Sequence, residues 1–330
     1  MDYKRILITG INGSGASYLT EHIVQKYPHV DIHGTQRWSS HSNSNLSEMS
    51  NNITIHESDL NDFPSTITTI ELVKPDAIVH LASKANVGIS HKTPISFLTN
   101  NVIGTANLLE AIKLSGIECR FLMCGSSEVY GNPNEKDYPM HEDIPFRPVS
   151  SYAVSKASQE LLANSYYYSY GMDVVITRMF SYFNPRRGDL FATSFANQVA
   201  LIEMGIKDKL YHGNLDSVRN ILDVRDAMSA YCYALRECHS GEAYNIGSTN
   251  IVKVADFLRY LINLSSSDIP TEPDMNLFRP KDVVLQVPSI DKFTDTTDWK
   301  PKFSYEDSVS YMLEKCRINM RDKYGQSKKS

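Results

Sequence analysis

The sequence predicts an α/β protein with a doubly wound parallel sheet and a smaller C-terminal α/β lobe. Short apolar runs alternate with longer amphipathic segments, which is the pattern of β–α–β units. Several runs are apolar at nearly every position, as strands buried on both faces are. A glycine-rich turn follows the first run. The expected strands are residues 5–10, 30–35, 53–59, 77–83, 119–127 and 174–180.

The pattern loosens after about residue 180, where prolines and aromatic residues become frequent and strands sparse. We therefore expect a first domain over residues 1–180 and a smaller lobe over residues 181–218 and 248–330. Residues 219–247 are expected to return to the first domain. Within them, the stretches 220–224 and 243–247 read as further strands of the main sheet.

The bulk composition excludes some classes of function. The net charge of the 330 residues is −5, so the surface as a whole should not attract nucleic acid or an anionic membrane. No run of about 20 apolar residues predicts a membrane span, and the N-terminus lacks the features of a signal peptide. The five cysteines form no CxxC pair, and their odd number argues against a disulfide framework. We expect buried free thiols, a cytoplasmic location and no metal site.

The glycine-rich turn at residues 10–16 predicts a dinucleotide site in a sheet of the Rossmann type. Gly10, Gly13 and Ala16 occupy the three positions of a GxxGxxG/A turn, with Ser14 and Gly15 between them. Glycine permits a tight turn and close approach of a pyrophosphate, and a small third residue lets the helix pack on the strand. The N–H groups at the helix N-terminus then face the anion.

The end of the second strand predicts which coenzyme binds. Sites for NAD usually place an acidic residue there, to bond the ribose 2′-hydroxyl. This chain has no acid in that stretch but has Arg37, which suits a 2′-phosphate, and Ser39, which adds a hydroxyl donor. NADP is therefore favoured over NAD, and the alternative is that Arg37 is a solvated surface residue.

Two further loops are assigned to the coenzyme. Asp59 and Leu60 follow the third strand and are expected to border the adenine; a helix N-cap is the alternative role. The fourth strand ends at Leu81, Ala82 and Ser83, which belong to the same expected site.

Tyr152 and Lys156 form a YxxxK pair. In a helix, side chains four residues apart lie on one face, one turn apart. A phenol is a poor base at neutral pH, but a nearby ammonium favours the phenolate. Tyr152 would then exchange a proton with a sugar hydroxyl while a hydride moves to or from the nicotinamide.

These motifs, with Ser126 at the end of the fifth strand, resemble the extended short-chain dehydrogenase/reductase family, among the nucleotide-sugar epimerases and dehydratases. Two branches of GDP-mannose metabolism compete. The stretches "GINGSGASYL", "HGTQRWSS", "NPRRGDLF" and "LFRPKDVVLQ" look like the GDP-mannose 4,6-dehydratases. The stretches "HLASKANV", "CGSSEVYG", "VSKAS" and "RNILDVRDA" look like the GDP-4-keto-6-deoxymannose reductases.

Glu128 bears on the choice between these branches. In both, the resemblance implies hydride transfer at sugar C4, with Ser126 bonding the C4 oxygen. A dehydratase also needs a base for the C5 proton, and Glu128 lies two residues after Ser126, which in an extended segment puts both on one side. We favour the dehydratase. The alternatives are the reductase, another GDP-hexose or GDP-heptose oxidoreductase or epimerase, and a dinucleotide-binding regulator without catalysis.

A GDP-sugar is an anion, so this acidic chain must supply local cations to its diphosphate. The resemblance implies that Arg219 and Arg279 contact the pyrophosphate or ribose, and that the region of Arg186 approaches the nucleotide. Lys84 and Asn86 would line the sugar pocket, and Asn101 would support the active site. The family usually reads Phe-Asn-His after the sixth strand, where this chain has Ser181 and Tyr182. The full expected substrate set is Lys84, Asn86, Ser181, Asn184, Arg186, Arg187, Arg219 and Arg279.

The resemblance also implies an oligomer. We expect a homodimer through the helices that carry "LLEAIKLS" and "YAVSKASQELLANSYYYSY", or a homotetramer that also uses the loop at residues 37–52.

Overall fold

The structure, a computed structural model, describes residues 1–38, 45–278 and 283–325. The chain forms two compact units. Unit 1 comprises residues 1–180, 227–246 and 288–300, and unit 2 comprises residues 181–226, 247–287 and 301–330. Unit 2 thus begins at the residue where the sequence pattern loosens. Residues 219–226 and Gly247 lie in unit 2 rather than unit 1, and residues 288–300 lie in unit 1 rather than unit 2.

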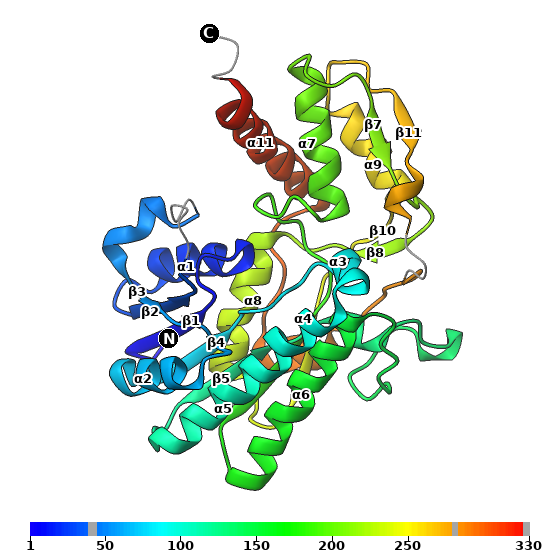
Figure 1. Ribbon diagram of the computed structural model, residues 1–330. Coiled ribbons are helices and arrows are strands. Elements are labelled where there is room, and N and C mark those ends of the chain that lie inside the picture. The colour runs from blue at the N-terminus through cyan, green and yellow to red at the C-terminus, as the bar shows by residue number, and fades with distance from the viewer. Residues whose placement is uncertain (39–44, 279–282, 326–330) are drawn as a thin grey trace. The chain divides into compact units, whose positions relative to one another are not determined.

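Unit 1 is built on a seven-stranded parallel sheet with the order β3-β2-β1-β4-β5-β6-β9 (Figure 1). Its first six strands have the order of a doubly wound dinucleotide-binding sheet, so the predicted fold class is confirmed. All six expected strands are present. The strands are β1 (Arg5–Thr9), β2 (Asp31–Gln36), β3 (Ile53–Glu57), β4 (Ala77–His80), β5 (Arg120–Cys124), β6 (Val174–Met179) and β9 (Ala243–Ile246).

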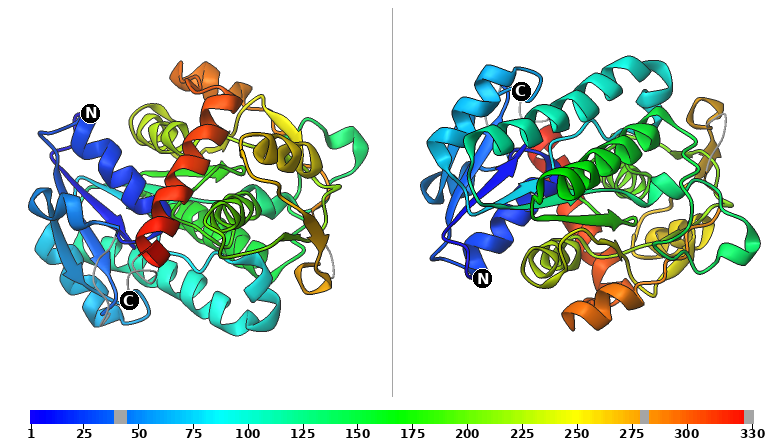
Figure 2. Two further views of the ribbon diagram at one scale, coloured as in Figure 1. Left: turned by 90° about the horizontal axis from the view of Figure 1, so that it is seen from above. Right: turned by 90° about the horizontal axis from the view of Figure 1, so that it is seen from below.

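Helices cover both faces of this sheet. Helices α2 (Phe63–Val73), α5 (Gly104–Ser115) and α6 (Ser151–Tyr170) pack on one face, and α1 (Ser14–Lys26) and α8 (Val224–Glu237) lie on the other (Figures 1 and 2). The remaining elements of unit 1 are η1 (Ser47–Asn52), α3 (Val87–Lys92), α4 (Pro94–Leu98), the π-helical turn η2 (Thr99–Ile103), η3 (Ser127–Tyr130), η4 (Glu135–Asp137) and α10 (Asp291–Thr297). The apolar strands therefore have cover on both sides, which explains their continuous hydrophobic runs.

One of the two expected return strands is wrong. Residues 243–246 form β9 and pair with β6, as predicted. Residues 220–224 do not join the main sheet, because Asn220 ends β8 (Val218–Asn220), which pairs with β10 (Ile251–Lys253). The apolar run "NILDV" instead supplies Ile221 to the core of unit 2.

Unit 2 packs three helices around its own apolar core. The core includes Phe195, Phe257 and Met312, all buried. Besides β8 and β10, its elements are α7 (Phe191–Glu203), β7 (Leu210–His212), α9 (Val254–Asn263), β11 (Thr271–Pro273), η5 (Met275–Leu277) and α11 (Tyr305–Tyr324).

Three chemical features of the described residues complete this picture. The five cysteines are free and buried, as predicted. No helix in the described part of the chain is long and apolar enough to cross a bilayer. Over the same residues, no group of three or more His, Cys, Asp or Glu side chains is placed to hold a metal ion.

Candidate active site

The glycine-rich turn brings the ends of β1 and β4 into close contact. Gly10 has a φ of +66°, and a Cβ added to it would lie 2.9 Å from the Cα of Ala82. The N–H of Gly13 donates to the carbonyl of Gly10 at 2.8 Å, and Gly13 is the N-cap of α1. The first N–H groups of α1 have no partner within the helix. A tight turn with glycine at positions 10, 13 and 15, at a helix N-terminus, fits a dinucleotide pyrophosphate.

Arg37 and Lys84 line one cavity of about 620 Å³ in unit 1. Arg37 directly follows β2, and Lys84 follows β4. Lys92 and Asn61 also line it, so three cations share the space. Ser39, the other residue expected to bind the 2′-phosphate, lies outside the described residues.

Asp59 does not cap a helix. Its Oδ1 accepts hydrogen bonds from Asn61, from the backbone N–H at 3.0 Å and the side chain at 3.3 Å. The N-cap of α2 is Asp62, so the alternative role for Asp59 is wrong. Leu60 is buried, and its carbonyl accepts a bond from Asn107 at 2.7 Å. The assignment of both residues to adenine stays a prediction.

Ser126 and Glu128 lie in a tight turn at the carboxyl end of β5. Ser126 is extended and caps the 3-10 helix η3, in which Glu128 is the second residue. The Oγ of Ser126 accepts the backbone N–H of Glu128 at 3.3 Å. The expectation that both residues share an extended segment is therefore wrong. The capping bond keeps the two residues close together. Because the Oγ of Ser126 accepts in this bond, its hydroxyl hydrogen can still donate to another group.

Helix α6 places Tyr152 and Lys156 one turn apart, as predicted. The helix begins at an N-cap, Ser150, whose Oγ accepts the N–H of Ala153 at 3.1 Å. Tyr152 and Lys156 are 8% and 4% exposed. The Nζ of Lys156 donates to the carbonyl of Cys124 at 2.9 Å, and α6 packs against η3. The YxxxK pair and the Ser126 turn therefore lie together.

A buried hydrogen-bond network supports this helix. Asn101, which was expected to support the active site, belongs to it, whereas the sequence did not reveal the other members. The Nδ2 of Asn101, in the π-helical turn, donates to the Oγ of Ser155 at 2.8 Å, and Ser155 donates to the carbonyl of Tyr152 at 2.7 Å. The Asn101 side chain also bonds the backbone N–H and carbonyl of Lys84, at 2.8 and 2.9 Å. Asn101 thus ties the Lys84 loop to the first turn of α6.

His80 extends the network to the glycine-rich turn, and its tautomer follows from its partners. Thr105 donates its hydroxyl hydrogen to the Asn101 carbonyl at 2.7 Å, so it accepts from the Nε2 of His80 at 2.8 Å. The Nδ1 of His80 then accepts from Thr9 at 2.8 Å. Burial, with the nearby Lys156 charge, lowers the pKa of His80 to about 3, so the ring is neutral.

Asn86 and Lys84 were expected to line the sugar pocket. The Asn86 side chain accepts the N–H of Ile89 at 2.8 Å and so caps α3. The backbone N–H of Lys84 donates to the Asn101 side chain, and Lys84 lines the same cavity as Arg37. A sugar contact for either residue stays a prediction.

The other expected substrate residues lie in unit 2. Arg187 pairs with Asp189 at 3.0 Å, and Nη1 of the buried Arg219 donates to the carbonyl of Val218 at 3.1 Å. The Oδ1 of Asn184 accepts the N–H of Arg186 at 3.1 Å. Ser181 donates to Gln286 at 3.5 Å. Arg279 lies outside the described residues.

The Nδ2 of Asn184 is buried and has no hydrogen-bond partner among the described residues. A buried donor without a partner is costly, which is consistent with a ligand-facing role.

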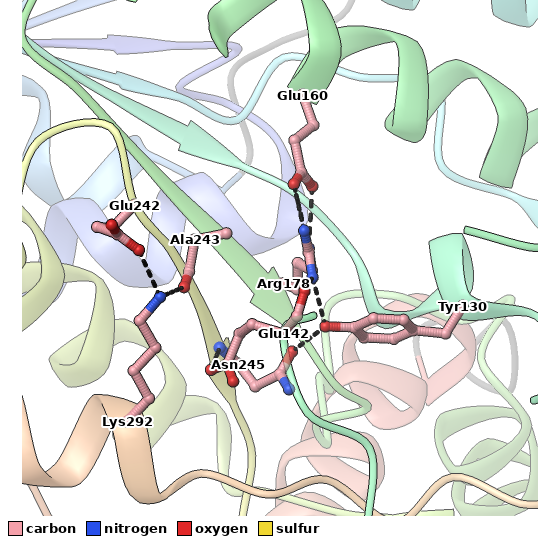
Figure 3. Close-up of polar contacts among 8 residues, drawn as sticks. All are labelled: Tyr130, Glu142, Glu160, Arg178, Glu242, Ala243, Asn245 and Lys292. Carbon is pink, nitrogen blue, oxygen red and sulfur yellow. Dashed lines mark hydrogen bonds and ion pairs between the residues drawn. The ribbon is translucent and has the colours of Figure 1, made fainter. Parts of the chain in front are cut away.

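Arg178 is a second feature that the sequence analysis missed. It lies in β6, all of whose residues are buried, and its guanidinium bonds Glu160 and Tyr130 (Figure 3). The signal in the sequence was a cation inside the apolar run "VVITRMF". His80 gave a similar signal, as an imidazole inside "AIVHLAS".

Comparison with known proteins agrees with the sequence resemblance. A family profile described as GDP-mannose 4,6 dehydratase matches residues 7–312. The GDP-mannose 4,6-dehydratase of Yersinia enterocolitica is 28% identical over 350 residues, which cover 94% of this chain and 93% of the relative. The GDP-6-deoxy-D-mannose reductase of Pseudomonas aeruginosa is 31% identical over 250 residues, which cover 75% of this chain and 82% of that one.

Solved structures match nearly the whole chain. RMD from Pseudomonas aeruginosa, complexed with NADPH, aligns with a TM-score of 0.81 at 26% identity, covering 96% of this chain and 99% of the other. The dTDP-glucose 4,6-dehydratase DesIV of Streptomyces venezuelae, with NAD bound, aligns with a TM-score of 0.85 at 25% identity, covering 96% and 98%.

Proposed function

Because the chain belongs to the GDP-mannose 4,6-dehydratase family, we propose that it is an NADP-dependent dehydratase of GDP-mannose or a closely related GDP-sugar. The observation that carries this proposal is Glu128, a half-buried carboxylate held beside Ser126 at the carboxyl end of β5. Ligands of doubly wound sheets bind at this end of the strands. A dehydratase needs a carboxylate base there. A simple reductase does not use such a base but can carry the same residue, since the stretch "CGSSEVYG" also resembles the reductases.

The first step oxidises C4 of the sugar. The nicotinamide coenzyme supplies, when bound, a reversible acceptor for the hydride. Tyr152 takes the proton of the C4 hydroxyl, and Lys156, one helical turn away, is the cation that favours its phenolate. The Ser126 hydroxyl donates a hydrogen bond to the same oxygen and so shortens the path of the proton.

The second step removes water. The C4 ketone makes the C5 proton acidic, because the resulting carbanion is an enolate. Glu128 takes that proton, and the C6 hydroxyl gains a proton and leaves as water. Return of the hydride to C6 and of a proton to C5 completes the 4-keto-6-deoxy sugar. The substrate loses one water, and no net oxidation occurs.

Three features support NADP and a nucleotide diphosphate sugar. The stretch directly after β2, residues 37–47, contains no acidic residue. Arg37 in this stretch lines a cavity with Lys84 and Lys92, so three cations are available to bind the 2′-phosphate. The glycine-rich turn at the N-terminus of α1 suits the pyrophosphate. The candidate ligands of GDP in unit 2 are Arg186, Arg187, Arg219 and Arg279. Asn184 joins them, because its Nδ2 has no partner within the described part of the chain.

Reduction of a 4-keto-6-deoxy sugar nucleotide is the second candidate function. It is favoured by the 31% identity to the reductase of Pseudomonas aeruginosa. The same Tyr152, Lys156 and Ser126 would serve that reaction, and Glu128 would then line the sugar pocket.

We propose a homodimer in which helices α5 and α6 of the two copies pack together. Two such dimers could form a tetramer. Three apolar side chains of α6 lie at intervals of seven residues and are exposed: Val154 by 39%, Leu161 by 60% and Tyr168 by 77%. Residues seven apart lie on one helix face, so they form a stripe that a second copy would cover. The buried free thiols support a reducing compartment such as the cytoplasm.

The test of this function uses purified protein and GDP-mannose, without added coenzyme, followed by mass spectrometry. A dehydratase returns its hydride, so residual bound coenzyme is enough and the sugar loses one water. Unchanged GDP-mannose, with NADPH consumed on addition of the 4-keto-6-deoxy sugar nucleotide, would identify the reductase instead.

A further inference from the structure

A buried ion pair joins strand β6 to helix α6 (Figure 3). The Nε of Arg178 donates to the two carboxylate oxygens of Glu160 at 3.2 and 3.1 Å, and Nη2 donates to Oε1 at 2.5 Å. The two side chains are 7% and 2% exposed. Burial by itself lowers the pKa of Arg178, but the pair with Glu160 outweighs this and raises it, so the guanidinium stays charged.

The other side of the guanidinium holds Tyr130. Nη1 of Arg178 donates to the Tyr130 hydroxyl at 2.7 Å and to the carbonyl of Glu142 at 2.6 Å. Having accepted that bond, the hydroxyl donates to the Oδ1 of Asn245 in β9 at 2.8 Å. The Nδ2 of Asn245 in turn donates to the carbonyl of Met140 at 2.9 Å. Burial raises the pKa of Tyr130 to about 12, so this phenol keeps the hydrogen that it donates.

Both ends of this cluster lie next to the proposed catalytic groups. Tyr130 ends η3, two residues after Glu128. Glu160 lies in α6 one turn after Lys156 and two turns after Tyr152. The chain of contacts from Glu160 through Arg178 to Tyr130 therefore connects the helix of the proton acceptor to the turn of the proposed base.

Stability alone is a weak reason for such a pair. Removing two charges from water carries a large desolvation cost, and apolar replacements of a buried pair are often as stable. Apolar side chains would fill the same volume between β6 and α6, but they would not fix an angle or a distance as a bidentate guanidinium does.

Resting on the dehydratase function, we propose that Arg178 and Tyr130 are positioning residues that set Glu128 relative to Tyr152 for removal of the C5 proton. Tyr152 and Lys156 have other anchors, namely the Asn101–Ser155 bonds and the Cys124 carbonyl. Loss of the Tyr130 hydroxyl therefore leaves Tyr152 and Lys156, the proposed proton acceptor and its cation, in place. It loosens only the turn that carries Glu128, and misplacement of a reacting group by about 1 Å can cost ~100-fold in rate.

The experiment compares Y130F with Y244F in the full-length protein. Tyr244 is as buried as Tyr130, at 1% against 0% exposure, and its hydroxyl accepts the N–H of His239 at 3.0 Å. Each variant thus loses one buried hydroxyl. Y130F should lower kcat for water loss by about 10- to 100-fold, leave KM within about 2-fold, and build up reduced coenzyme that is visible by its absorbance. Y244F should keep the wild-type kcat.

A second measurement does not depend on activity. Hydrogen exchange at the backbone N–H of Gly131, which donates to the Glu128 carbonyl at 3.2 Å, reports the order of the turn. Exchange there should become faster in Y130F and stay unchanged in Y244F. R178K, which keeps the charge but loses the fork, should behave as Y130F does.

The outcomes of these experiments test the dehydratase function and the positioning role of Tyr130 separately. A wild-type protein that removes no water from GDP-mannose refutes the proposed function, and the exchange data then decide whether Tyr130 orders the turn. If the wild type is active but Y130F matches Y244F in kcat and in exchange, the positioning role is wrong. A kcat loss in Y130F without reduced coenzyme would also overturn it, because C4 oxidation would then have failed.

Discussion

Replacement of His80 tests the buried network that holds the site together. The His80 ring is fully buried and its tautomer is fixed by Thr9 and Thr105, so it has no place for a second proton. Its pKa falls from the ordinary 6.5 to about 3 on folding, mainly by burial and then by the charge of Lys156. Below pH 6.5, His80 therefore binds a proton in the unfolded chain but stays neutral in the folded chain. His80 thus makes the protein less stable as pH falls, and it has no effect well above pH 6.5.

The size of this effect follows from the two pKa values. With 6.5 in the unfolded and about 3 in the folded chain, the free energy of unfolding falls by about 2 kcal/mol between pH 8 and pH 5. The variant H80N keeps an acceptor for Thr9 and loses the bond to Thr105, which costs about 1 kcal/mol at every pH. At pH 8, H80N should be less stable than the wild type. Between pH 8 and pH 5, its free energy of unfolding should lack the fall of about 2 kcal/mol that His80 causes.

Urea unfolding of the wild type and H80N over this pH range measures the difference. Burial also lowers the pKa of His56, with the His33 charge adding to it, but that contribution is common to both proteins and cancels. Parallel pH curves would refute the neutral, buried ring. So would a histidine NMR signal, absent from H80N, that titrates near pH 6.5 in the folded wild type.

Three further predictions concern the site and the assembly. Y152F should lower kcat by about 100- to 10,000-fold with coenzyme affinity little changed, because the proton acceptor is lost and the pocket is kept; turnover at the wild-type rate would rule out the scheme. R37A should weaken NADP binding by about 10- to 100-fold, measured by calorimetry, and leave NAD binding unchanged, since only the 2′-phosphate contact is lost. L161E should give a monomer by sedimentation, whereas L72E should not, although Leu72 on α2 is 69% exposed against 60% for Leu161; a monomeric wild type would contradict the dimer.

The sheet and the two main motifs were predictable because their signals are local. Strands such as Val174–Met179 are apolar throughout, since helices cover both faces of the sheet. The turn from Gly10 to Ala16 and the Tyr152–Lys156 spacing depend on the backbone of one short segment each. The strands, the glycine-rich turn and the Tyr152–Lys156 pair therefore lie in the structure where the sequence predicted them.

Short-range geometry was less predictable where tertiary contacts decide it. The Ser126–Glu128 segment looked extended but forms a 3-10 turn capped by Ser126. The run at residues 220–224 has a strand composition, but Ile221 packs into the core of unit 2 and β9 takes the edge of the main sheet.

The buried polar networks could not be assembled from the sequence. His80 and Arg178 stand out as polar residues inside apolar runs, which is the signal to look for. Their partners Thr105, Gln159 and Tyr130 are 25, 79 and 48 residues away along the chain, so no local pattern pairs them.

The measurement that tests the central claim most directly is incubation of the wild type and E128Q with GDP-mannose in deuterium oxide, followed by mass spectrometry. We expect the wild-type product to lack one water and to carry deuterium at C5, because Glu128 removes the C5 proton and solvent replaces it. E128Q should form reduced coenzyme but no dehydrated sugar. Water loss at the wild-type rate in E128Q, or GDP-mannose recovered unchanged from the wild type, would contradict Glu128 as the base of a dehydratase.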